Sequence, residues 1–365
     1  MKKLGISLYP EISENLQKDK EYLDLAAKYG FTRLFVCLLS TSVRTRSEVL
    51  SIFKDLNAYA KEKGFEIIFD VSPKKFKELH ITYQDLSFFK EIYADGIRMD
   101  ESFGGKEEAE MTYNPLGLKI ELNASVFDNL IDRVLCFHPN QEKLMTCHNF
   151  YPLRYSGLGI KSFKEATSKM RAYQLRTAAF VTSQNPGSFG PCFNEGLCTL
   201  EIHRDLPLEL QIRHLKAMDM VDDIVIGNAY ASEDELRCAK KAFDALLTFN
   251  IKARNNTSLE EEILYDFKHI ARGDISDYMI RSTMPRLRYH DQSIPLHDTE
   301  KWVHRGDVII MNDQLGRYKA EVHLALQTME NDGRMNVVGS IVPQELILLD
   351  EVRPWSRFIL RKEEK

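Results

Sequence analysis

The chain has 365 residues, of which 44% are hydrophobic and 28% are charged, and its formal net charge is −5 at pH 7. This is ordinary globular composition, and the length predicts two domains. The acidic balance argues against a general nucleic-acid binder, because such a protein presents a basic surface to phosphates.

The N-terminal segment has two lysines followed by only a short apolar run, so we expect no secretory signal. No apolar run approaches the ~20 residues of a membrane helix. We therefore expect a cytoplasmic protein without a membrane partner. The six cysteines form no CxxC pair and the histidines form no HExxH motif, so we expect reduced thiols, no metal site and no cofactor.

Eight short apolar runs recur about every 30 residues and predict strands. They cover residues 4–9, 33–38, 66–71, 96–100, 119–124, 144–150, 177–183 and 223–228. Helical apolar spacing lies between most of them, at 16–29, 46–63, 126–137, 162–175 and 206–218, and again at 233–247. This alternation predicts an α/β protein with a closed (β/α)8 TIM barrel. A doubly wound open sheet is the alternative, but no GxGxxG motif supports it. The segment 101–117 has weak helical character and is expected to be irregular.

The pattern changes near residue 248. Alternating or β-rich runs follow at 250–254, 307–311, 318–327, 336–341 and 346–349. We therefore divide the chain into a barrel domain, residues 1–247, and a small β-rich domain, residues 248–365.

Polar side chains gather at the ends of the predicted barrel strands, where barrel enzymes carry their chemistry. From strand alternation we place six of them on the inner face near one mouth: Asp70, Arg98, Asp100, Glu121, Asn123 and His148. Buried charges are costly unless they are paired. The alternative is an ion-pair network of Arg98, Asp100 and Glu121 that only fills the barrel.

Three further segments carry candidate binding residues. Residues 147–159 place His148, Asn149, Tyr151 and Arg154 at a strand-to-loop junction. The glycine-containing loop 184–199 is a predicted lid, with Gln184 and Glu195, and Glu201, His203 and Arg204 lie on a short helix beyond it. In the second domain, Arg281 and Arg286 could hold a phosphate or a carboxylate, although a solvated turn is an equal alternative.

Two or more carboxylates around a small polar cavity are typical of glycosidic cleavage. One protonated carboxyl group protonates the leaving oxygen, and a second carboxylate stabilises or attacks the anomeric carbon. Crowding of like charges raises one pKa and leaves the partner ionised. Aromatic residues such as Tyr9, Phe150, Tyr151 and Tyr155 could stack on a sugar ring.

With GISLYP (5–10), IELNAS (120–125), HNFYP (148–152) and RSTMPR (281–286) in hand, the chain resembles the bacterial 6-phospho-N-acetylmuramidase family over its whole length. The resemblance implies a TIM barrel followed by a cyclophilin-like β-barrel domain. It also implies hydrolysis of the β-1,4 bond of 6-phospho-N-acetylmuramyl-N-acetylglucosamine in cell-wall sugar recovery. One departure is Leu153, where a more polar residue is expected.

We assign the working carboxylates from strand phase alone, as Asp100 and Glu121 with Asp70 in reserve. The predicted substrate-binding residues are Arg98, Asn123, His148, Asn149, Tyr151, Arg154, Gln184, Glu195, Arg281 and Arg286. The nucleophile stays open between an enzyme carboxylate, the acetamido oxygen of the substrate and water. The alternative functions are a sugar-phosphate isomerase or aldolase, which lacks an obvious strand-end lysine, and a non-catalytic sugar-phosphate-binding protein.

Overall fold

The computed structural model describes residues 2–10, 15–39 and 45–363. The chain forms two compact units, Met1–Phe243 and Asp244–Lys365. The sequence places the boundary between residues 247 and 248, and Leu247 is the first residue of strand β9 (Leu247–Ala253). Each unit has a hydrophobic core of its own.

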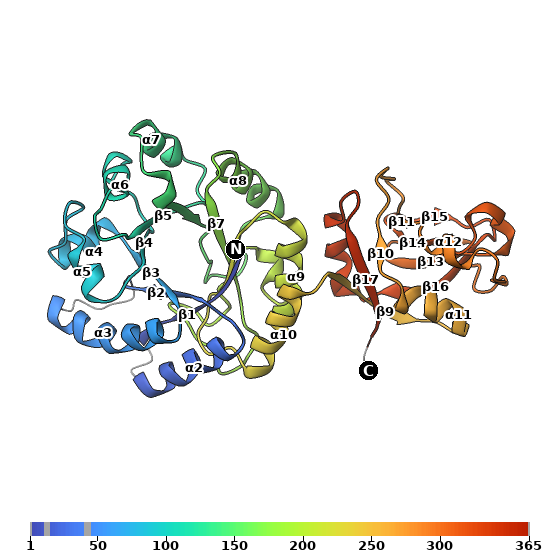
Figure 1. Ribbon diagram of the computed structural model, residues 1–365, viewed down its shortest axis with the longest axis horizontal. Coiled ribbons are helices and arrows are strands. Elements are labelled where there is room, and N and C mark those ends of the chain that lie inside the picture. Colours follow the sequence, from blue (N-terminus) through green and yellow to red (C-terminus); the bar gives the residue numbers. More distant parts are fainter. Residues whose placement is uncertain (1, 11–14, 40–44, 364–365) are drawn as a thin grey trace. The chain divides into compact units, whose positions relative to one another are not determined.

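Eight parallel strands form a closed barrel in the first unit, and β8 pairs back onto β1 (Figure 1). They are β1 (Lys3–Leu8), β2 (Arg33–Cys37), β3 (Glu66–Val71), β4 (Gly96–Met99), β5 (Lys119–Asn123), β6 (Leu144–Cys147), β7 (Arg176–Val181) and β8 (Asp223–Ile226). Nearly every strand residue is buried, because one face of the sheet meets the barrel interior and the other meets the helices. The predicted (β/α)8 barrel is confirmed, and the open-sheet alternative is wrong because β1 has a partner on both sides.

Helices surround the barrel (Figure 1). The longer ones are α2 (Leu16–Lys28), α3 (Arg46–Glu62), α8 (Ile160–Ala172), α9 (Leu208–Met218) and α10 (Glu233–Asp244), and the short ones are α4 (Pro73–Glu78), α5 (Ser87–Glu91), α6 (Lys106–Met111) and α7 (Leu130–Cys136). The unit after β4 is irregular, as predicted. Its turn is organised by Glu108, which accepts hydrogen bonds from the backbone of Phe103 (2.6 Å) and Gly105 (2.8 Å), and α6 follows as a helix of only six residues.

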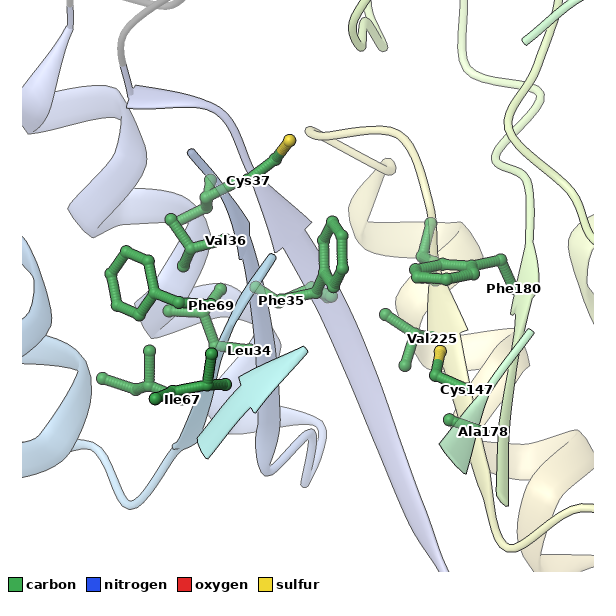
Figure 2. Packing of buried hydrophobic residues seen from close by; sticks show 14 of the residues in the cluster. Leu34, Phe35, Val36, Cys37, Ile67, Phe69, Cys147, Ala178, Phe180 and Val225 are labelled. Carbon is green, nitrogen blue, oxygen red and sulfur yellow. The ribbon is translucent and has the colours of Figure 1, made fainter. Parts of the chain in front are cut away.

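The inward face of β2 shows how the barrel interior is filled. Side chains alternate along a strand, so Arg33, Phe35 and Cys37 share one face in ascending order towards the carboxyl end. Phe35 packs edge-to-face against Phe180 of β7, with ring centroids 5.1 Å apart, and Figure 2 shows both rings in the barrel interior. Along β2, a layer of charged side chains at Arg33 is therefore followed by a layer of aromatic rings at Phe35, and Cys37 lies nearest the carboxyl end.

The second unit contains a seven-stranded, mostly antiparallel sheet in the order β10-β17-β9-β16-β13-β14-β11. Its strands besides β9 are β10 (His269–Ile270), β11 (Met279–Ser282), β13 (Asp307–Met311), β14 (Val322–Ala325), β16 (Met335–Ile341) and β17 (Arg357–Lys362). A two-stranded sheet pairs β12 (Trp302–Val303) with β15 (Met329–Glu330). The β-rich second domain is confirmed, and its cyclophilin-like classification stays a prediction.

One predicted strand of the second unit is wrong. Residues 346–349 lie within a 3-10 helix, η5 (Pro343–Glu351), because Pro343 stands in its first turn, where proline favours a helical start. Four short strands, β10, β11, β12 and β15, and the C-terminal strand β17 were not predicted. They have two to six residues, which is too short for a clear alternating pattern.

Among the described residues, no helix combines the length and the apolar composition needed to cross a membrane.

Candidate active site

A cavity of about 460 Å³ opens at the carboxyl ends of the barrel strands, which is where barrel enzymes carry their active sites. It is built from the ends of β2, β3 and β4 and from the loops after β2, β4, β6 and β7. Its lining residues are Cys37, Leu39, Asp70, Arg98, Asp100, Asn149, Phe150, Pro191 and Cys192.

Two carboxyl groups meet at one guanidinium nitrogen in this cavity. Arg98 Nη1 donates to Asp70 Oδ1 and also to Asp100 Oδ1, the latter at 3.1 Å. Strand pairing sets this up, because Asp70 and Arg98 are in register on β3 and β4, and Asp100 follows Arg98 by two residues on the same face. Asp70 is 3% exposed, whereas the Asp100 side chain is 35% exposed. The arrangement therefore joins a buried carboxyl group to a solvent-accessible one.

The two acids differ in their environment. Burial raises the pKa of Asp70 to about 6, an effect that Arg98 opposes and the charge of Asp100 reinforces. A carboxyl group with such a pKa is partly protonated near neutral pH and can donate a proton. The sequence predicted such a shift from the crowding of like charges, and in the structure burial is the larger cause.

The HNFYP segment supplies the opposite wall through Asn149 and Phe150. Arg98 Nη2 donates to Asn149 Oδ1, so the amide group is fixed with its oxygen on the guanidinium. The Asn149 backbone is also held, since its N–H donates to Ser125 Oγ (2.8 Å) and its carbonyl accepts from Thr199 Oγ1 (2.8 Å). Phe150 presents an aromatic ring to the cavity and packs edge-on against Phe180.

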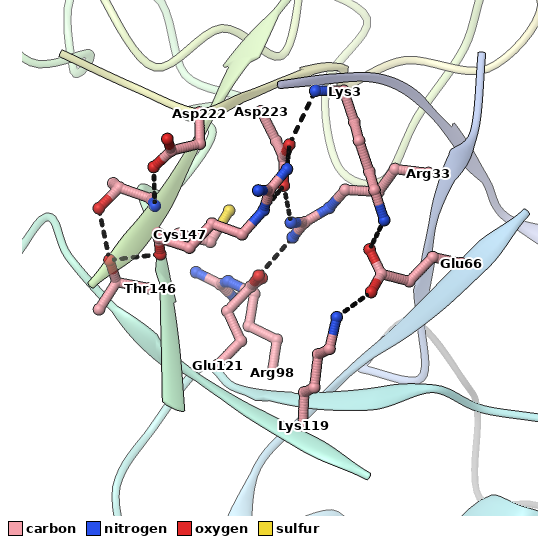
Figure 3. A network of polar contacts seen from close by, with 12 residues as sticks. Lys3, Arg33, Glu66, Arg98, Lys119, Glu121, Thr146, Cys147, Asp222 and Asp223 are labelled. Atoms are coloured by element: carbon pink, nitrogen blue, oxygen red, sulfur yellow. Dashed lines mark hydrogen bonds and ion pairs between the residues drawn. The ribbon is translucent and has the colours of Figure 1, made fainter. Parts of the chain in front are cut away.

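Glu121 does not line this cavity. Its side chain is fully buried and pairs with Arg33, which also donates to Asp223 at 2.8 Å (Figure 3). A buried guanidinium without counter-charges is strongly destabilising, and Glu121 and Asp223 together supply them. The predicted convergence of Asp100 and Glu121 on one cavity is therefore wrong. Glu121 does belong to a buried ion-pair network, but its partner there is Arg33 and not Arg98.

His148 lies on the other side of the barrel wall from the position that we predicted. Its Nε2 is 2.9 Å from Thr167 Oγ1 of α8, its Nδ1 is 3.3 Å from Ser125 Oγ, and its ring packs on Phe163. Alternation explains the error, since Cys147 takes the inward position and His148 must then face the helices. Burial and the charge of Arg98 lower the pKa of His148 to about 3, so the ring is neutral.

Asn123 is likewise absent from the lining of the main cavity. Its side-chain oxygen accepts a hydrogen bond from the backbone N–H of Ser125 (2.9 Å), which shapes the turn after β5. Ser125 in turn contacts Asn149 and His148. Asn123 therefore supports a turn that holds a cavity residue.

A second, more polar cavity of about 220 Å³ lies among the loops after β6, β7 and β8. It contains Arg154, Gln184 and Glu195, three of the predicted binding residues. Arg154 makes two bonds to Asp205, at 2.7 and 3.0 Å, and its backbone N–H donates to Glu195 (3.1 Å). The side-chain amide of Gln184 donates to a backbone carbonyl, that of Arg204, at 2.9 Å.

Arg204 ties the loop after β6 to the predicted lid after β7. It donates to the carbonyls of Tyr151 (3.0 Å) and Leu153 (3.2 Å) in the first loop, and to those of Glu195 (3.0 Å) and Gly196 (3.2 Å) in the second. Tyr151 is half-buried, and Arg204 holds its backbone carbonyl beside the site. The guanidinium is saturated by these carbonyls and by Glu201 at 2.7 Å, so Arg204 organises the loops.

The remaining candidates near the lid have structural partners. Glu201 accepts hydrogen bonds from the backbone of Tyr155 and Gly157, each at 2.8 Å, and so fixes the turn of the first loop. His203 is fully buried, with its Nε2 2.8 Å from His214 Nδ1 of α9, and does not reach the mouth.

Arg281 and Arg286 belong to the second unit and each has an acidic partner there. Arg281 Nη2 lies 2.8 Å from Asp274, and Arg286 Nη1 lies 2.8 Å from Glu321. Arg286 also lies over the Tyr318 ring, 5.6 Å from its centroid. Their predicted contact with substrate stays a prediction.

Four cavity residues were not among the predicted ones: Cys37, Leu39, Pro191 and Cys192. Cys37 carries a signal that alternation could have found, since it shares a face with Phe35 and ends its strand. Pro191 and Cys192 belong to the predicted lid, but a loop sequence gives no direction for its side chains. Among the residues that the structure describes, no three His, Cys, Asp or Glu side chains gather in a way that could hold a metal ion.

Comparison with known proteins adds a family relationship. A family model described as 6-phospho-N-acetylmuramidase, N-terminal, matches residues 4–241, and one described as 6-phospho-N-acetylmuramidase, C-terminal, matches residues 247–361. An uncharacterised protein of B. cereus has a similar crystal structure, with 41% identity over 99% of both chains and a TM-score of 0.88. A conserved protein of unknown function from Enterococcus faecalis has 24% identity over 99% of this chain and 96% of that one, with a TM-score of 0.72. No curated protein matches the chain.

Proposed function

Because the chain belongs to the 6-phospho-N-acetylmuramidase family of glycoside hydrolases, we propose that it cleaves the β-1,4 bond of 6-phospho-N-acetylmuramyl-N-acetylglucosamine. The reaction would serve the recovery of cell-wall sugars in the cytoplasm. The observation that carries this proposal is the pair of carboxyl groups, Asp70 and Asp100, on one nitrogen of Arg98 in the main cavity.

In this proposal Asp70 is the general acid and Asp100 is the second carboxylate. Cleavage of a glycosidic bond needs a proton on the leaving oxygen and negative charge near the anomeric carbon. Burial supports the acid role of Asp70 by raising its pKa, and exposure to the cavity supports the second role for Asp100. Glu121, which strand phase favoured, is replaced by Asp70 because its carboxylate is committed to Arg33.

The same geometry suggests how the substrate is held. Asn149 offers its amide NH2 to a sugar hydroxyl or to the N-acetyl group while its oxygen stays on Arg98, and Phe150 offers a face to a sugar ring. Tyr151, Gln184 and Glu195 would contact the substrate from the loops.

The anionic groups of the substrate need cationic partners. Arg154 is the candidate in the barrel unit for the lactyl carboxylate or the 6-phosphate. It would exchange its present acidic partner for the substrate anion. An exposed ion pair contributes little stability, so this exchange is accessible for Arg154 and Asp205.

The shared contact with Arg98 places the two carboxyl groups close together, which is relevant to stereochemistry. A separation of ~5–5.5 Å is typical of enzymes that retain the anomeric configuration, and ~6.5–9.5 Å of those that invert it. Two oxygens on one nitrogen favour the shorter spacing. Retention is compatible with attack by Asp100 or by the acetamido oxygen of the substrate, and proton NMR of the first-formed anomer tests it.

The experiment that tests the function is incubation of the purified protein with the phosphorylated and the unphosphorylated disaccharide, with products read by mass spectrometry. We expect cleavage of the phosphorylated compound. Asp70→Asn and Asp100→Asn should each slow turnover by about 10²-fold or more, which is the contribution of a positioned acid or base. Cleavage of neither disaccharide by folded protein would refute the proposal.

A further inference from the structure

The two oxygens of the Asp70 carboxyl group have different neighbours. Oδ1 accepts a hydrogen bond from Arg98 Nη1, whereas Oδ2 lies 3.7 Å from the sulfur of Cys37. A guanidinium that donates to Oδ1 opposes a proton on that oxygen, because two positively polarised hydrogens would then compete for it. The transferable proton of Asp70 therefore belongs on Oδ2, beside the thiol.

The barrel fixes Cys37 in this position. It is the last residue of β2, it is in register with Asp70 of β3, and it lines the cavity with 5% of its surface exposed. Figure 2 shows it at the end of β2, beyond Phe35. Among the described residues, the titratable or charged groups that act on Asp70 or on this thiol from the surrounding strands include Tyr9, Arg98, Asp100 and Cys147.

We propose that Cys37 is a positioning residue for the glycosidase reaction, because its thiol keeps the proton of Asp70 on Oδ2 and holds the ionised carboxylate only weakly. A thiol is a weak donor and a weak acceptor, so the contact at Oδ2 holds neither protonation state of Asp70 firmly. A hydroxyl group in its place would donate strongly to the ionised form, and an alkyl group would not donate at all. This inference rests on the proposed role of Asp70 as the general acid.

The proton moves from Oδ2 to the glycosidic oxygen as the bond between that oxygen and C1 breaks, and the bonding electron pair stays with the leaving oxygen. The S–H group of Cys37 then donates to the ionised Oδ2. Water supplies the hydroxyl group that ends on C1, and its proton returns to Asp70 directly or through solvent. The sum is the addition of one water molecule across the bond, with the thiol unchanged.

The test compares the pH dependence of kcat/KM for wild type, Cys37→Ser and Cys37→Ala. The alkaline limb of this profile reports the acid of the free enzyme. We expect Cys37→Ser to move that limb to lower pH and Cys37→Ala to move it to higher pH, each by roughly half a pH unit or more. The phosphate group of the substrate also titrates near pH 6, but it does so equally for all three proteins.

Opposite shifts are the signature of a hydrogen bond to Asp70, because a purely structural effect of a smaller side chain would act alike in both variants. Cys136→Ser, an exposed cysteine on α7, is the matched control and should keep the wild-type limb. If Cys37→Ser does not fold, Cys37→Ala alone decides, and its limb must rise. Unshifted limbs, or shifts in one direction, overturn the inference while the hydrolase function stands. Wild-type turnover in Asp70→Asn overturns the inference together with the proposed role of Asp70, and cleavage of neither disaccharide by the folded wild type overturns the function itself.

Discussion

At the scale of single residues, Asp70 carries an energetic cost that its proposed role explains. Its pKa of about 6 in the folded chain exceeds its ordinary value of 3.8, so the folded state binds the proton more tightly than the unfolded state. Stability therefore falls as pH rises from about 4 to 6, and the loss persists above pH 6. The two values correspond to a cost on the order of 3 kcal/mol for the ionised group.

Asp70→Asn should therefore slow turnover by about 10²-fold or more and stabilise the fold at the same time. Asparagine resembles the protonated acid and cannot ionise, so the free energy of unfolding should rise by about 2–3 kcal/mol at pH 8 and change little at pH 4. Urea unfolding at the two pH values measures this difference. A variant that is less stable than wild type at pH 8 would show that the pair with Arg98 outweighs the burial of the charge.

Glu121→Gln should behave in the opposite way. The substitution weakens the support of a fully buried Arg33, and Asp223 alone remains on that guanidinium. Removing one partner of a buried ion pair costs about 3–5 kcal/mol, so we expect a lower midpoint of unfolding, but kcat of the folded protein within a few-fold of wild type. Steady-state kinetics and chemical unfolding check the two halves. A loss of kcat as large as that of Asp100→Asn would show that Glu121 takes part in catalysis.

These residues show what strand phase can and cannot supply. Alternation predicted that Asp70, Arg98, Asp100 and Glu121 face inwards, and it placed the first three at the cavity. It could not say which partner a long side chain takes, and Glu121 reaches Arg33, which comes from a strand that is not its neighbour in the barrel. The error at His148 is a shift of one residue, which moves every side chain to the other face.

At the scale of elements, the eight barrel strands were predictable because each is an apolar run bounded by turns, and they are repeated at nearly constant spacing. The loops after them were harder, since their shape depends on contacts between segments far apart in the sequence. Arg204 is the main example. It holds carbonyls of residues 151 and 153 and of residues 195 and 196, and its own position in the sequence gives no sign of this.

Arg204→Met should loosen both loops. Four backbone carbonyls would lose their donor, so hydrogen exchange should increase at residues 151–157 and 195–199. Because the loops after β6 and β7 also line the main cavity, we expect KM to rise by roughly tenfold with a smaller change in kcat. Arg237→Met, which removes an exposed arginine from α10, is the control. An unchanged KM would show that the order of these loops does not contribute to substrate binding.

At the scale of the whole molecule, buried histidines link folding to pH. Burial lowers the pKa of His148 to about 3 and that of His269 to about 4, and it also lowers the pKa of His203 and of His323. The unfolded chain binds these protons near pH 6.5 and the folded chain does not, so stability falls as pH drops below 6.5. Asp70 opposes this trend, as does His297, whose pKa is raised by Asp298 and Glu260 against the effect of burial.

Between pH 6 and pH 5, His148 and His269 each take up nearly one proton on unfolding, His203 and His323 add to this uptake, and Asp70 releases part of one proton. Each proton changes the free energy of unfolding by about 1.4 kcal/mol per pH unit, so we expect stability to decrease by at least about 1 kcal/mol between pH 6 and pH 5. His148→Gln should reduce this slope by one proton while leaving kcat close to wild type, because His148 lies against α8 and outside the cavity. Denaturant unfolding between pH 5 and 7 measures the slopes of wild type and of His148→Gln, and an unchanged slope in His148→Gln would mean that its ring is protonated in the folded barrel.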